Sequence, residues 1–282
     1  MAEKSKTKTT TDLKLKNVLV DQSSNEEDEK DSGIDIGLSL DKLNLGPKKK
    51  LLVLCLGGLL VDRVHVRDKK SVRGLRPDAV YGKFLVFKRP FCTEFLKFCF
   101  ERFEVGLWSS AREHNIEGVL SEITGGMRSK LVFVWGQEEC TDSQFYCLHK
   151  EEKPLFLKEL NDLWEIKKGK YSASNTLLID DEPHTALLNP PNTAIFPQPY
   201  KKHNPSDTYL GPNGELRKFL EGLADAADVP SYVKDHRIGQ PEITPSHPNW
   251  NYYEKIVRKF EKRKSKGAES EDDDEDAYSG DD

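Results

Sequence analysis

Short apolar runs, each ended by glycine, serine or aspartate, alternate along the chain with segments whose apolar residues recur at helical spacing. The runs predict buried strands at 51–56, 104–108, 131–135, 175–179 and 193–197. The spaced residues predict helices at 91–99, 115–123, 155–165, 216–223 and 250–262. This alternation predicts an α/β fold with a central, mostly parallel sheet.

The first run leads into the most informative loop of the chain. A basic approach at 48–50 precedes the apolar run 51–56, which ends abruptly at Gly57 and Gly58, as in a buried strand that enters a tight loop. Ligands of open α/β sheets bind at the carboxyl ends of such strands. The thiol of Cys55 and the hydrogen of Gly57 therefore stand where a working loop usually carries polar side chains.

Two other predicted strands end in polar residues. Asp180 and Asp181 follow the run at 175–179, and adjacent carboxylates after a buried strand are costly unless a cation or hydrogen-bond donors satisfy them. They are candidate metal ligands. Alternatively, they lie in an exposed turn that caps the next helix. Ser109 and Ser110 follow the run at 104–108, where a serine also suits a helix N-cap.

The composition indicates how much of the chain folds and which compartment it occupies. The 282 residues suffice for one domain with tails, and 36% hydrophobic residues beside 32% charged residues is little apolar content for a fully folded chain. Residues 1–46 and the basic-then-acidic tail at 261–282 are predicted to be disordered. Five cysteines without a CxxC pair indicate a reducing, intracellular compartment. No apolar run is long enough to cross a membrane, and the N-terminus lacks a signal-peptide core.

Five segments resemble, in the same order, the motifs of the haloacid-dehalogenase-like (HAD) phosphatases. They are LVLCLGGLL at 52–60, KRPF at 88–91, GLWSS at 106–110, FLKEL at 156–160 and LIDDEP at 178–183. Together they are similar to the branch with the TFIIF-associating and small phosphatases of the RNA polymerase II C-terminal domain (CTD), also called the NLI-interacting-factor family, and most of all to its plant members. The resemblance implies a three-layer HAD-like domain at 47–260, with a small insertion or flap after the first strand at 62–87.

The resemblance also implies roles for single residues. In the family, the first aspartate of the first motif attacks phosphorus and binds Mg²⁺, and the second serves as acid and base. Ser109 or Ser110 would donate a hydrogen bond to the phosphoryl group, and Lys158, expected on the helix at 155–165, would balance its charge. Asp180 and Asp181 would complete the Mg²⁺ shell.

This chain departs from the family in the first motif, because Cys55 and Gly57 replace both aspartates. A soft sulfur and a missing acid predict no Mg²⁺ or only weak Mg²⁺ binding, and no intact catalytic residue. Cysteine phosphatases carry a Cys-x5-Arg loop, but Val61 stands at the arginine position here, which disfavours Cys55 as a substitute nucleophile. We expect a buried thiol that fills the end of the strand.

We therefore expect a phosphatase-like protein that has lost catalysis and binds a phosphorylated or basic peptide through the old cleft. Ser109, Ser110 and Lys158 would hold a phosphate, whereas Asp180 and Asp181 would favour a basic peptide.

Two alternatives stay open. One is a residual Mg²⁺-dependent phosphoserine phosphatase acting on the CTD. The other is a peptide-binding domain related to the receptor subunit of the mitochondrial presequence translocase, which would place the protein in mitochondria. Otherwise we expect a monomer in the nucleus or cytoplasm, without direct nucleic-acid binding.

Overall fold

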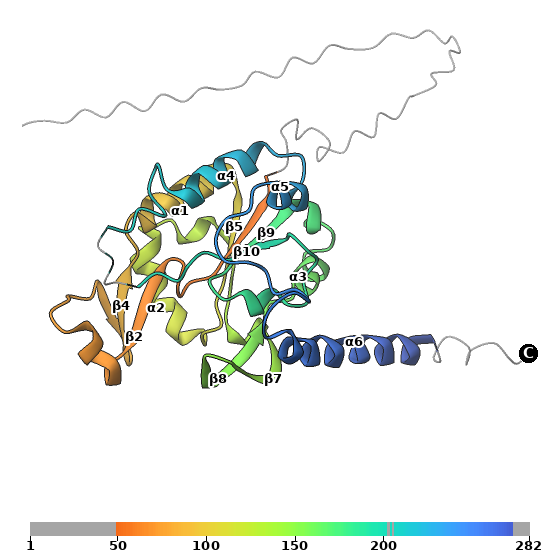
Figure 1. Cartoon of the computed structure of the whole chain (residues 1–282). Helices are drawn as coiled ribbons and strands as arrows, with labels where there is room; N and C mark the ends of the chain where they lie inside the picture. The colour runs from red at the N-terminus through yellow and green to blue at the C-terminus, as the bar shows by residue number, and fades with distance from the viewer. Residues whose placement is uncertain (1–48, 202–203, 205, 273–282) are drawn as a thin grey trace, which may run out of the picture. The chain divides into compact units, whose positions relative to one another are not determined.

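The computed structural model describes residues 49–201, 204 and 206–272, with side chains placed through residue 263. A five-stranded sheet lies at its centre, in the order β10-β9-β1-β5-β6 (Figure 1). Its strands are β1 (Leu51–Leu54), β5 (Glu104–Trp108), β6 (Leu131–Trp135), β9 (Thr176–Ile179) and β10 (Ala194–Ile195). All neighbouring strands pair in parallel, which confirms the predicted fold class.

Helices cover both faces of this sheet and make three layers. One face is covered by α1 (Cys92–Arg102), α2 (His114–Thr124), α4 (Glu215–Asp225) and α5 (Val229–Asp235). The other face is covered by α3 (Leu160–Ile166). Side chains of a strand point alternately to the two faces, so Leu52 and Leu54 join the first layer and Leu51 and Val53 join the second. Strand β1 is therefore buried on both sides and fixed at the centre of the core.

The insertion after β1 is a small antiparallel sheet in the order β2-β4-β3. Its elements are β2 (Val61–His65), the 3-10 helix η2 (Val66–Val72), β3 (Ala79–Tyr81) and β4 (Phe84–Lys88). Val72 of η2 packs against Val64 and Phe87 on one face of this sheet. Tyr81 lies so close to Gly118 of α2 that a side chain at that glycine would overlap its ring. The expected insertion at 62–87 thus folds as a flap that is anchored on α2.

A β-hairpin is present where the sequence predicted the start of a helix. Strands β7 (Thr141–Cys147) and β8 (Lys150–Leu157) form in a segment for which the sequence predicted no strand, and β8 takes up the start of the helix expected at 155–165. Leu155 and Leu157 are fully buried on one side of β8, where they pack against the C-terminal helix α6 (Trp250–Asp272). Their period-two spacing runs directly into the helical spacing of α3, which made the two elements read as one helix.

Three further observations concern the ends of elements. Phe91, expected on the apolar face of the first helix, instead precedes α1 with a φ of 65° and a side chain that is 42% exposed. The last helix continues to Asp272, past its expected end at residue 262. The predicted disorder at 1–46 and at the end of the acidic tail lies outside the described residues.

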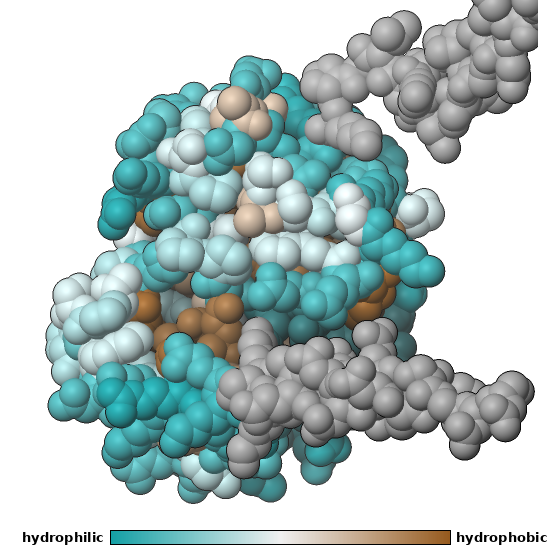
Figure 2. All heavy atoms as spheres, turned by 90° about the vertical axis from the view of Figure 1, so that its right-hand side faces the viewer, coloured by the Kyte–Doolittle hydropathy of each residue, from teal (hydrophilic) through white to brown (hydrophobic). Residues whose placement is uncertain are grey.

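The surface on the α6 side of the molecule is mostly hydrophilic, with apolar residues gathered near the middle of the face (Figure 2). Within the described residues, no helix is both long enough and apolar enough to span a bilayer.

Candidate functional site

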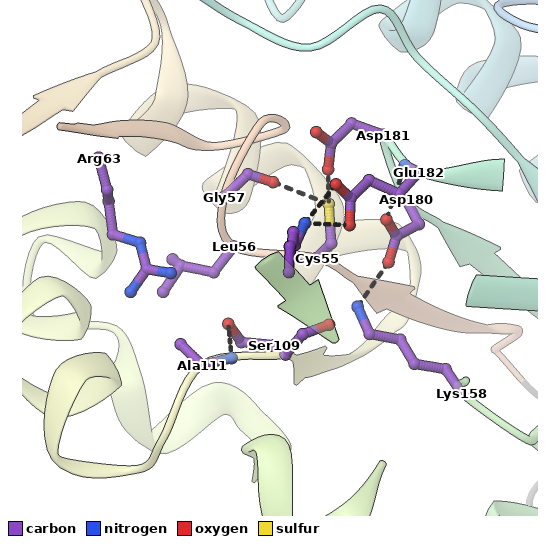
Figure 3. Close-up of a pocket in the computed structure, with 12 residues that line it drawn as sticks. Cys55, Leu56, Gly57, Arg63, Ser109, Ala111, Lys158, Asp180, Asp181 and Glu182 are labelled. Carbon is purple, nitrogen blue, oxygen red and sulfur yellow. Dashed lines mark hydrogen bonds and ion pairs between the residues drawn. The ribbon is translucent and has the colours of Figure 1, made fainter. Parts of the chain in front are cut away.

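The order of the central sheet reverses at β1, because β5 and β6 continue on one side of it and β9 and β10 on the other. In open parallel sheets, ligands bind beyond the carboxyl ends of the strands at such a reversal. A pocket lies there (Figure 3). Its lining is Cys55, Leu56, Gly57, Arg63, Ser109, Ser110, Ala111, Lys153, Lys158, Asp180, Asp181 and Glu182. All seven site residues expected from the sequence are therefore brought together.

Cys55 stands at the end of β1, where its backbone N–H donates to the carbonyl oxygen of Ile179 at 2.9 Å. Its side chain is only 3% exposed. The sulfur lies 3.3 Å from the carbonyl oxygen of Gly57 and 3.6 Å from Asp181 Oδ1. Burial, and then the charges of Asp180 and Asp181, raise the pKa of the Cys55 thiol well above its usual value. The thiol is therefore protonated at neutral pH and a poor nucleophile.

The two glycines after Cys55 differ in what they permit. Gly58 has a φ of 75°, and a Cβ built on it would lie 1.9 Å from Asp181 Oδ2, so the carboxylate of Asp181 occupies the space of the missing side chain. Gly57 has an ordinary φ, and a Cβ there would meet nothing within 4 Å. The backbone therefore requires glycine at 58, whereas position 57 has room for an acid.

Lys158 directly follows β8 and does not lie on a helix, which corrects the expected placement. Its backbone N–H donates to Thr185 O at 2.7 Å, and its carbonyl accepts from Asn189 Nδ2 at 2.9 Å. Its ammonium donates to Trp108 O at 2.8 Å and to Asp180 Oδ2 at 2.5 Å. Both ionic side chains are nearly inaccessible to solvent.

This pairing fixes the charge of Lys158. Burial, the largest single effect, lowers the pKa of the ammonium, but the charge and hydrogen bond of Asp180 together with smaller effects of other neighbours raise the pKa above its ordinary value. Asp180 also accepts from the backbone N–H of Glu182 at 2.9 Å, but it is buried, unlike the exposed helix-capping turn considered as its alternative. The positive charge of Lys158, predicted to offset that of a phosphoryl group, is thus already paired with the negative charge of Asp180.

Asp181 and Glu182 face the same pocket with different surroundings. Burial, followed by the charges of Asp180 and Glu182, raises the pKa of Asp181 to about 7. Burial alone would raise the pKa of Glu182, but the adjacent Lys153 ammonium, with smaller effects from nearby histidines, holds that pKa below the usual value. At neutral pH the pocket therefore keeps a paired Glu182 beside a partly protonated Asp181.

The hydroxyls after β5 were expected to contact a phosphoryl group. Ser109 is buried, and its Oγ accepts from the backbone N–H of Ala111 at 3.2 Å, so it caps a turn well before α2 begins at His114. Ser110 is less buried and also lines the pocket. Both hydroxyls are near the pocket, and Ser109 caps a turn and not the helix N-terminus considered as its alternative.

Arg63 was missed by the sequence analysis. It lies on β2 of the flap, two residues beyond the position inspected for a phosphate-binding arginine, and its side chain extends toward Leu56 (Figure 3). The guanidinium carbon lies 5.5 Å from the ring centre of Phe84. In the described part of the chain, no carboxylate forms an ion pair with it. No motif marks this residue, because its place at the pocket follows from how the flap folds back.

The residues fit the Mg²⁺ ion of the family poorly. One ligand atom each of Cys55, Asp180 and Asp181 lie within 4.8 Å of one another, which is close enough to share a cation. Mg²⁺ takes hard oxygen ligands in a nearly ideal octahedron. Here the central donor is sulfur, and an oxygen of Asp180 is engaged by the ammonium of Lys158.

Comparisons with known proteins show which family the chain belongs to. The family of NLI interacting factor-like phosphatases matches residues 50–230. The chain belongs to this family. It is 28% identical over 199 residues to an uncharacterized FCP1 homology domain-containing protein of Schizosaccharomyces pombe, covering 66% of this chain and 75% of that protein. It is 28% identical over 191 residues to the ubiquitin-like domain-containing CTD phosphatase 1 of Xenopus laevis, covering 67% of this chain and 54% of the relative.

A viral relative and a solved structure extend the comparison. The putative CTD phosphatase-like protein of invertebrate iridescent virus 3 is 28% identical over 190 residues, which are 62% of this chain and 96% of the viral protein. The structure of the fission yeast RNA polymerase II CTD phosphatase Fcp1 bound to beryllium fluoride matches with a TM-score of 0.39 at 13% identity, over 79% of this chain and 66% of the other. Family membership rests on the sequence match rather than on this likeness.

Proposed function

We propose that this domain binds a phosphorylated peptide segment in the pocket and does not hydrolyse it. The observation that carries the proposal is the loop after β1, where a buried, protonated Cys55 and a bare Gly57 occupy the positions of the family's two catalytic aspartates. Hydrolysis in the family needs a carboxylate nucleophile and an acid. Neither is supplied by this loop.

The charges of the pocket favour a phosphorylated ligand over a basic one. Two of its three acids are paired within the pocket, Asp180 with Lys158 and Glu182 with Lys153. The third, Asp181, is partly protonated at neutral pH because its pKa is raised to about 7. Arg63 is the lining cation that forms no ion pair among the described residues, and a guanidinium suits the two oxygens of a phosphate.

One relative is named as a CTD phosphatase and another as a putative CTD phosphatase-like protein, so a phosphorylated CTD peptide is a suitable first probe. The comparison needed is between the wild-type protein and the double variant Cys55→Asp/Gly57→Asp, with phosphate release measured with and without Mg²⁺. Position 57 accepts the new side chain, since its backbone is relaxed and the adjoining space is open.

The expected result is no Mg²⁺-dependent release by the wild type, and release by the double variant that is at least about a thousandfold faster, because loss of a nucleophile costs up to about a millionfold. The single variant Gly57→Asp is the matched control and stays inactive, since it restores only the acid. Mg²⁺-dependent turnover by the wild type that disappears in Asp181→Asn would establish the alternative, a residual phosphatase.

A further inference from the structure

The donor atoms around Cys55 are spaced like the ligands of a bound cation. The sulfur lies 3.6 Å from Asp181 Oδ1 and 3.3 Å from the carbonyl oxygen of Gly57. In a tetrahedral zinc site, with Zn–S at about 2.3 Å and Zn–O at about 2.0–2.2 Å, neighbouring sulfur and oxygen ligands are about 3.5 Å apart. The two sulfur–oxygen distances therefore match those of neighbouring ligands in a tetrahedral zinc site, and ligand atoms of Cys55, Asp180 and Asp181 all lie within 4.8 Å of one another.

The backbone is also shaped around one of these donors. The Asp181 carboxylate packs into the space left by the missing side chain of Gly58, whose φ of 75° favours glycine. Within the described residues, the carboxylate forms no ion pair, and its hydrogen-bond partner is the Cys55 thiol. Asp180 is a weaker donor because Lys158 and the backbone N–H of Glu182 engage its two oxygens.

The nature of the donors selects among cations. Sulfur is a soft ligand that suits Zn²⁺ and similar ions, whereas Mg²⁺ prefers oxygen ligands and gives up its water reluctantly. We propose that Cys55, Asp181 and the Gly57 carbonyl, with Asp180 beside them, form a site for a thiophilic divalent cation of the zinc class in preference to Mg²⁺. On binding, the S–H bond of Cys55 breaks, the sulfur bonds the cation, and the proton passes to solvent.

This inference is independent of whether the pocket binds a peptide, and it has its own readout. Co²⁺ is a spectroscopic substitute for Zn²⁺, and a cobalt–thiolate bond produces a charge-transfer band in the near ultraviolet. Titration of the full chain with Co²⁺, in a reductant that is not a thiol, should produce this band. Equilibrium dialysis with Zn²⁺ alone should give a stoichiometry of one for this site.

The variants test which cysteine carries the bond. Cys55→Ser should lose the band and weaken Zn²⁺ binding at least about tenfold, whereas Cys140→Ser, which replaces another thiol near the pocket, should keep both. A second zinc-competent pair needs its own control, because Cys147 Sγ lies 3.8 Å from His184 Nε2. Thermal unfolding followed by circular dichroism confirms that each variant is folded.

Three outcomes would overturn the proposal. The first is a band that survives in Cys55→Ser but disappears in Cys147→Ser, which would place the ion at the other pair. The second is competition by Mg²⁺ at the same concentration as Zn²⁺. The third is the absence of the band in the wild type. If Cys55→Ser fails to fold, Cys55→Asp serves in its place, since it should abolish the cobalt–thiolate band while restoring a preference for Mg²⁺.

Discussion

The loops after β1 and β9 leave neighbouring strands of one sheet but carry different functional groups. The two strands are parallel neighbours, with Leu54 opposite Ile179, and both are wholly buried. The loop after β9 has three consecutive acids, 180–182, whereas the loop after β1 lines the pocket with Cys55, Leu56 and Gly57 and offers no carboxylate. The comparison shows that packing fixes the strands and the directions of the loops, while the residues at the loop tips can change without altering the fold.

The largest loss of stability is expected from breaking the ion pair between the acidic loop after β9 and Lys158, which follows β8. Lys158→Met removes the partner of a buried carboxylate, Asp180, and should lower the free energy of unfolding by about 3–5 kcal/mol. Urea denaturation measures this loss. The double variant Lys158→Met/Asp180→Asn should regain part of it, because no uncompensated charge stays buried. A loss below about 1 kcal/mol in the single variant would show that the ion pair does not hold the two loops together.

The next effect separates the two neighbouring glycines of the β1 loop. Gly58→Ala should cost about 1–3 kcal/mol of unfolding free energy, since the backbone is left-handed there and the new Cβ overlaps the Asp181 carboxylate. Gly57→Ala is the matched control and should change stability by no more than about 0.5 kcal/mol. Equal losses for both variants, measured by urea denaturation, would mean that Asp181 does not depend on the shape of this loop.

A smaller effect is expected on ligand affinity. Arg63→Ala should weaken the binding of a phosphorylated peptide about tenfold, which corresponds to one lost charge-assisted hydrogen bond, and should leave the unphosphorylated peptide unaffected. Isothermal titration calorimetry gives both affinities. Arg67→Ala removes the same charge from an exposed site on the flap and should change neither. If Arg67→Ala weakens binding equally, the flap contributes only its overall charge.

The last effect concerns the pH dependence of stability. The pKa of Asp181 rises from an ordinary value of 3.8 to about 7 on folding, so the folded state holds a proton that the unfolded state has released between these values. The free energy of unfolding should therefore fall as pH rises from about 5 to about 7 and level off above that. In EDTA, Asp181→Asn should remove this part of the slope. An unchanged slope in the variant would assign it to other groups.

The sequence predicts the parts of this molecule that are governed by simple periodicity. Apolar runs identified all five strands of the central sheet, because strands buried on both faces are nearly continuous in apolar residues. The hairpin β7–β8 escaped because its pairing is irregular between Asp142 and Cys147, which breaks the alternation that marks a strand. Lys158 was consequently assigned to the wrong element although it was assigned to the right pocket.

The site was partly predictable for a similar reason. Residues at or directly after the carboxyl ends of predicted strands, such as Cys55, Ser109 and Asp180, had to meet at one edge of the sheet. Arg63 lines the pocket from the flap, and Asn189 holds the backbone of Lys158 from a loop outside the pocket lining; no periodic pattern places either residue there. The pairing of Lys158 with Asp180 also depends on side-chain geometry that spacing along the chain does not contain.

The central claim is that the pocket holds a phosphorylated peptide and leaves its phosphate in place. Phosphorus NMR of a phosphorylated CTD peptide, mixed with equimolar wild-type protein and Mg²⁺, observes binding and hydrolysis in one sample. The account predicts a shifted or broadened phosphoserine resonance and no growing signal of inorganic phosphate. A growing, Mg²⁺-dependent signal of inorganic phosphate, or a phosphoserine resonance that the protein leaves unchanged, would contradict it.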